Sequence, residues 1–174
     1  CCNHLANLVL QQSFILDNTL HTMRDNVLQL STFLRRRDIA ELLGATCPEN
    51  VEHRWLYLGD ICEFVRRQKE KLLEMALISQ DTFIEVMRFY VIILPILFLQ
   101  RQLESHDTRL GDVFPLVMDA AHELIVLSTQ FGMPWVRSLR VLLTVLYGRF
   151  MMTKRGDILA LAYALSPYGA SQYY

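Results

Sequence analysis

The sequence predicts an all-α fold, and three observations support that prediction. Apolar residues recur at the helical spacing of three and four residues through most of the chain. Glycine and proline are scarce, with 7 and 5 among 174 residues, which indicates short connections. No segment alternates apolar and polar residues between turn signals, as a strand would. We therefore predict a compact bundle of about five main helices with two short ones, and the alternative is a fragment of a helical-repeat solenoid.

The length of the chain and its 52% apolar residues favour a single domain over residues 1–174. Within it we expect a helical hairpin of residues 1–43 and 51–78, a more apolar half of residues 79–166, and a tail of residues 167–174. The chain starts at a cysteine rather than an initiator methionine. We therefore expect it to have been excised from a larger protein.

The first long helix is expected over residues 5–34. Its apolar positions form a narrow seam that only Ser13 interrupts, while polar residues between them, including Asp17, are expected to face water. The seam consists of Val9, Leu16, Leu20, Met23, Val27, Leu30 and Leu34. Packing inside a bundle is one interpretation of such a seam, and an intermolecular coiled coil is the other.

Two further helices are expected before the apolar half. Asp38 suits the cap of a short helix that ends at Leu43, and Gly44 suits the position just past its end. After a loop, a second long helix is expected from about Val51 to Ile78, with an apolar seam on one face and a charged opposite face. This helix and the first one would form the hairpin.

The most apolar stretch runs from Phe83 to Leu103 and contains Pro95. A helix that is apolar all round is surrounded by protein or lipid. Its uninterrupted apolar run, Phe89 to Leu99, is shorter than the ~20 residues that cross a bilayer, so we predict a central buried helix and no transmembrane segment. Because proline lacks a backbone donor, we expect Pro95 to bend this helix or to split it into two.

Three more helices complete the prediction, each with a recognisable start or stop. One runs from Asp112 to Phe131 before Gly132, one from Pro134 to Phe150, and a short one from Ile158 to Leu165.

Charge and cysteine usage limit the compartment and the partners. The 17 basic and 18 acidic residues give a net charge of −1, which does not support a global attraction to nucleic acid or to an acidic membrane. The 4 cysteines form no CxxC pair and no even framework. We therefore expect a reducing intracellular location, cytoplasmic or nuclear.

Catalytic motifs are not found. His122–Glu123 begins like a zinc-peptidase motif, but Val126 stands where the second histidine is needed. The glycines form no phosphate-binding loop and no serine lies in a GxSxG turn. The sequence therefore predicts no enzyme, no cofactor and no metal site.

Basic clusters suggest one alternative function, a nucleic-acid-binding helical domain. Seven arginines are candidates for contacts with phosphate: Arg35, Arg36, Arg37, Arg66, Arg67, Arg137 and Arg140. Acidic residues lie between the clusters, so this alternative is not the favoured one.

The apolar surplus favours a different function, because a domain of this size does not hide every large side chain. We predict a protein–protein interaction or scaffold domain that presents an apolar helix face or groove to another chain or to a second copy of itself. The candidate contact residues are Leu16, Leu20, Met23, Val27, Tyr147, Phe150 and Met151. A membrane-peripheral helical domain is the remaining alternative, based on the apolar run at residues 89–99.

Overall fold

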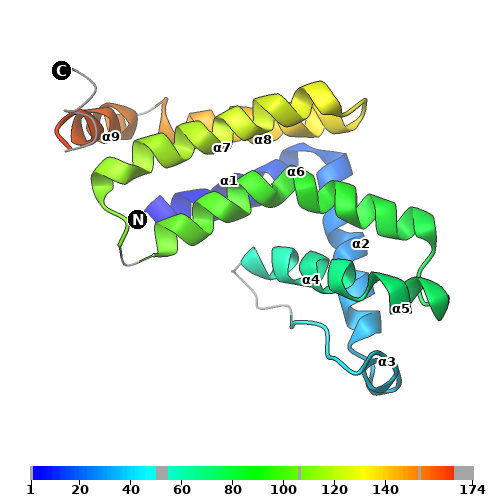
Figure 1. Ribbon diagram of the computed structural model, residues 1–174. Helices are drawn as coiled ribbons and strands as arrows, with labels where there is room; N and C mark the ends of the chain where they lie inside the picture. The colour runs from blue at the N-terminus through cyan, green and yellow to red at the C-terminus, as the bar shows by residue number, and fades with distance from the viewer. Residues whose placement is uncertain (1, 50–54, 106, 153, 167–174) are drawn as a thin grey trace. The chain divides into compact units, whose positions relative to one another are not determined.

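The all-α prediction is confirmed. The computed structural model describes residues 2–49, 55–105, 107–152 and 154–166, and this part of the chain forms nine helices and no strand (Figure 1). The helices are α1 (Cys2–Leu16), α2 (Asn18–Leu34), α3 (Arg37–Leu43), α4 (Leu56–Arg67), α5 (Lys69–Glu74), α6 (Gln80–Glu104), α7 (Leu110–Gln130), α8 (Trp135–Phe150) and α9 (Lys154–Ala164).

The chain forms two compact units. Unit 1 comprises Cys1–Asp17 together with Pro95–Tyr174, and unit 2 comprises Asn18–Leu94. The chain therefore passes from one unit to the other twice, once between α1 and α2 and once inside α6. Helix α6 contributes its first part to unit 2 and the part that starts at Pro95 to unit 1.

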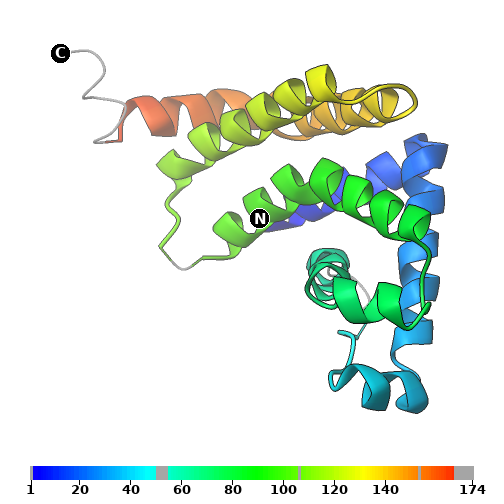
Figure 2. The same ribbon diagram turned by 45° about the vertical axis from the view of Figure 1, so that its right-hand side comes forward.

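In unit 1, α8 packs against both α1 and α7, and α7 also packs against α9. The two views show α7 and α8 side by side (Figure 2). One face of α8 is buried at intervals of three and four residues, which is the pattern of an amphipathic helix in a bundle. That face consists of Trp135, Ser138, Leu139, Leu142, Val145, Leu146 and Phe150.

In unit 2, α2 packs against α3 and α4. The backbone after α3 turns at Gly44, whose φ of 67° lies in the left-handed region that glycine adopts without cost. Lys71 on α5 then donates a hydrogen bond to the Leu43 carbonyl over 2.7 Å. The loop that follows is held to α2 because the Ser31 hydroxyl donates to the carbonyl oxygen of Pro48 over 3.3 Å.

Helix α6 runs unbroken through Pro95. Of the two outcomes expected for this proline, the split is therefore wrong, and the bend stays a prediction. Ser79 caps the start of α6 by accepting a hydrogen bond from the Thr82 backbone N–H over 3.0 Å. Of the described helices, α6 alone is long and apolar enough to cross a membrane, yet half of its most apolar window is buried within the protein. Core helices of soluble proteins share those properties.

The predicted first helix is interrupted, and this corrects the expectation for residues 5–34. Helix α1 ends at Leu16 and α2 begins at Asn18, with Asp17 between them. Asp17 does not face water as expected, because only 2% of it is exposed and its carboxylate accepts a hydrogen bond from Ser138. Aspartate is a weak helix former that favours helix boundaries, which fits a break at this position.

The second long helix is also shorter than expected. It is divided into α4 and α5 at Gln68, and α5 ends at Glu74, two residues before Ala76 takes a positive φ of 53°. Its expected start at Val51 lies outside the described residues. The later helices agree with the sequence prediction to within a few residues at each end, although α9 already begins at Lys154.

We predict that Phe150→Ala lowers the free energy of unfolding by about 3–5 kcal/mol, because the side chain is 0% exposed and its removal leaves a cavity. The matched control is Tyr147→Ala on the same helix, where the ring is 40% exposed and the loss should be about 1 kcal/mol or less. Urea denaturation followed by circular dichroism measures both. Equal losses for the two variants would contradict the described packing of α8.

Candidate partner-binding site

The candidate contact residues do not form one surface. Leu20, Met23 and Val27 are buried in unit 2, and Phe150 is buried in unit 1. These four side chains are core residues in the structure. Leu16 is 54% exposed and Tyr147 is 40% exposed, both in unit 1, while Met151 is partly exposed beyond the end of α8.

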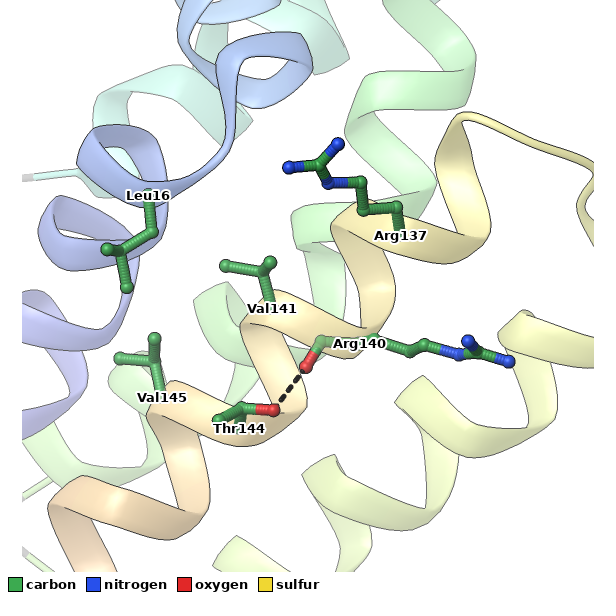
Figure 3. A pocket seen from close by; sticks show the side chains of 6 residues that line it. All are labelled: Leu16, Arg137, Arg140, Val141, Thr144 and Val145. Atoms are coloured by element: carbon green, nitrogen blue, oxygen red, sulfur yellow. Dashed lines mark hydrogen bonds between the residues drawn. The ribbon is translucent and has the colours of Figure 1, made fainter.

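An apolar hollow of about 200 Å³ lies between the end of α1 and the middle of α8, within unit 1. Its lining residues are Leu16, Arg137, Arg140, Val141, Thr144 and Val145. Figure 3 shows Leu16, Val141 and Val145 facing one another across this hollow. We call it the α1–α8 hollow. It contains the exposed Leu16 and two of the arginines that the sequence singled out.

Two polar contacts fix α1 on α8 and therefore set the shape of the hollow. The Ser138 hydroxyl donates to the Asp17 carboxylate over 2.9 Å, and both residues are buried. Near the C-terminal end of α8, the Arg149 guanidinium donates to the amide oxygen of Gln12 on α1, from Nε over 2.9 Å and from Nη2 over 2.6 Å. Hydrogen bonds of this kind define which residues lie opposite each other along the helix pair.

The arginines at the hollow differ from the other candidate arginines in their partners. Neither Arg137 nor Arg140 has an acidic partner within the described residues, and both are exposed. In Figure 3 the Arg137 guanidinium lies at one end of the hollow, whereas the Arg140 side chain points away from Leu16. The Thr144 hydroxyl is already used, because it donates to the Arg140 carbonyl over 2.8 Å.

The remaining candidate arginines all pair with carboxylates. Each pair has a short N–O distance: Arg35–Glu49 at 2.9 Å, Arg36–Asp38 at 2.8 Å, Arg37–Glu41 at 2.9 Å, Arg66–Glu63 at 2.7 Å and Arg67–Glu63 at 2.9 Å. The hydrogen bond from Arg66, assisted by Arg67, lowers the pKa of Glu63 to about 2. These five guanidinium groups are therefore paired with four carboxylates, because Arg66 and Arg67 share Glu63.

A second hollow, of about 360 Å³, lies within unit 2 between α2 and α6. It is more polar than the first, since Asn26, Asp81, Thr82 and Glu85 line it together with Met23, Leu30 and Val86. The Glu85 carboxylate accepts a hydrogen bond from Arg88 over 2.6 Å. Within the described residues, no group of three His, Cys, Asp or Glu side chains is placed to hold a metal ion.

Cys47 and Cys62 do not provide a reactive thiol. Cys47 and Cys62 are free and buried in unit 2. Burial raises the pKa of both thiols, so the thiolate that acts as a nucleophile is disfavoured at neutral pH.

Sequence reasoning missed the two valines of the hollow and the burial of Asp17, which follows Leu16 in the chain. Val141 and Val145 are four residues apart and so share one face of α8, which is a signal that the sequence contains. The partner of Asp17 could not be found in this way, because Ser138 is 121 residues away in the chain.

A scan against protein-family models, a search of the curated proteins and a search of the solved structures found no match. The function is therefore argued from the chemistry of the α1–α8 hollow itself.

We predict that Asp17 and Ser138 are energetically coupled. Removing either side chain takes one hydrogen bond away from a buried polar group, so Asp17→Ala and Ser138→Ala should each cost about 1–3 kcal/mol of stability. The double variant should cost less than the sum, by about 1 kcal/mol. A double-mutant cycle by urea denaturation measures this difference, and additive losses would contradict the contact.

A second prediction concerns Glu63 and pH. Its pKa is lowered in the folded chain from 4.5 to about 2, so the carboxylate stabilises the fold above about pH 4.5 and loses that effect as the pH falls toward 2. Because Arg66 and Arg67 are exposed, Glu63→Gln should cost only about 1 kcal/mol or less at pH 7. Urea midpoints of both proteins between pH 7 and pH 3 test this, and a difference that does not shrink on acidification would contradict it.

Proposed function

We propose that the chain is a protein–protein interaction domain, which binds a helical segment of a partner chain at the α1–α8 hollow. The observation that carries this proposal is the apolar hollow next to the exposed Leu16. A helix laid along a groove and anchored by one apolar side chain is a common mode of peptide recognition.

The size of the hollow supports a side chain as the occupant. Small-molecule sites usually measure about 300–1,000 Å³ and surround most of the ligand. The α1–α8 hollow measures about 200 Å³ and its walls are valine, leucine and threonine with two arginine stems. It is therefore suited to one anchoring side chain, such as leucine or methionine, rather than to a whole metabolite.

The energetics point to a modest interaction. Complete burial of a leucine side chain contributes about 1.5–3 kcal/mol, and Leu16 is already about half covered. A partner would therefore gain about 1 kcal/mol from Leu16 and more from its own anchor. Such an interface is expected to be transient, as is usual for small recognition domains.

The structure favours this function over the nucleic-acid alternative because the arginine clusters of unit 2 are engaged with acids. The membrane-peripheral alternative depends on α6, and half of the most apolar window of this helix is buried. Self-association belongs to the same class as the proposal, and a second copy would need to supply the anchoring side chain. Buried free cysteines are in keeping with the proposed intracellular location.

We predict that Leu16→Gln weakens binding of helical peptides about tenfold, because it places an amide at the wall of the apolar hollow. The peptides come from a phage-displayed helical library selected on the natural sequence. Leu42→Gln is the matched control, since Leu42 is 55% exposed, close to the 54% of Leu16, but lies on α3 in unit 2.

Fluorescence anisotropy with the selected peptides measures the affinities. The control should bind as the natural chain does. If both variants bind every selected peptide equally well, or if no peptide is selected, the α1–α8 hollow is not the binding site and the proposal fails.

A further inference from the structure

We infer that the segment bound at the α1–α8 hollow is acidic, with carboxylates placed beside its apolar anchor so that one of them meets Arg137. This inference rests on the proposed function and adds the chemistry of the partner. It is carried by the distribution of charge around the hollow.

The two helices that form the hollow carry positive charge without any acidic residue. Residues 2–16 and 135–150 contain Arg137, Arg140 and Arg149 and no Asp or Glu. Arg149 donates to the neutral amide of Gln12, so its charge is not cancelled there. Because the whole chain has a net charge of −1, this surface is a local exception to the balance of the molecule.

The nearest carboxylate in the sequence does not neutralise this surface. Asp17 follows directly after α1, but it is 2% exposed and accepts a hydrogen bond from Ser138. Arg137 and Arg140 have no acidic partner within the described residues, in contrast to the arginines of α3 and α4. A carboxylate from a partner would therefore meet a guanidinium group that has no competing ion pair there.

The geometry defines where that carboxylate would lie. Figure 3 places the Arg137 guanidinium at one end of the hollow that Leu16, Val141 and Val145 enclose. Side chains three or four residues apart on a helix lie about one turn from each other. A partner helix with an apolar residue in the hollow can therefore present Glu or Asp to Arg137 from the next turn. Exposed Arg140, which also lines the hollow and whose side chain points away from Leu16, adds to the positive potential.

An acidic peptide suits this surface better than a nucleic acid. The hollow is apolar and offers a place for an aliphatic side chain, which the phosphate backbone does not have. The electrostatic affinity for a nucleic acid grows with the number of phosphates that the protein neutralises, and α8 presents three arginines. Complementary charge at the rim of an apolar contact is the usual arrangement in protein–protein recognition.

The test uses a phage-displayed helical library with a leucine stripe, in which the positions flanking the stripe are Glu, Gln or Lys. Selection on the natural chain should enrich Glu at the flanking positions. Arg137→Glu should weaken the selected acidic peptides about tenfold, and peptides with Lys in place of those Glu residues should bind this variant more tightly than they bind the natural chain. Lys154→Glu on α9 changes the net charge equally and should leave the affinity almost unchanged.

The outcomes separate the two proposals. Enrichment of Gln or Lys, with binding still lost in Leu16→Gln, would overturn the acidic partner and leave the proposed function standing. Selected peptides whose binding depends on neither Leu16 nor Arg137 would overturn both. A single-stranded DNA oligonucleotide or phosphatidylglycerol vesicles that bind the natural chain and displace the acidic peptides would assign the surface to phosphate instead, and would also overturn the inference.

Discussion

Unit 1 depends on the packing of α1 against α8, which joins segments that are more than a hundred residues apart in the chain. Helix α8 packs against two neighbours, because both α1 and α7 contact this helix. Its remaining face is left to solvent and carries Arg137, Arg140 and Thr144. The α1–α8 hollow is therefore a consequence of the fold, formed where α1 ends at Leu16 beside Val141 and Val145 of α8.

The contact combines apolar burial with a small number of polar bonds, and the two have different roles. Fully buried side chains such as Leu10, Phe14 and Leu142 supply most of the stabilisation, since burial is roughly proportional to apolar area. The Asp17–Ser138 hydrogen bond adds less net free energy, because burying a carboxylate is itself costly. We interpret this hydrogen bond as the contact that fixes where α1 ends and how α1 aligns with α8. The walls of the hollow depend on that alignment.

The sequence was sufficient to predict structural features that depend on residues close together in the chain. Helical spacing of apolar residues predicted α6, α7 and α8 closely, and Gly44 predicted the end of α3. The break at Asp17 was missed because a single aspartate does not interrupt a helical pattern, and its buried partner is distant in sequence. For the same reason, the pattern could not show that Leu20, Met23 and Val27 are core residues while Leu16 is exposed.

The charged residues show the same limit of prediction from sequence. A run of three arginines at Arg35–Arg37 is the most visible basic feature of the sequence, yet each of these side chains pairs with an acid. Arg137 and Arg140 are less conspicuous, but they lack acidic partners in the described part of the chain. Local pairing, and not the number of basic residues, determines which positive charge is free to attract a partner.

The most direct measurement of the central claim is an NMR map of the surface that a selected helical peptide covers. Titration of the ¹⁵N-labelled chain should shift the backbone amides of Leu16, Val141, Thr144 and Val145, which surround the hollow. Shifts confined to α9, where Ile158 and Leu161 are also exposed, or confined to unit 2, would contradict the claim that the α1–α8 hollow is the binding site.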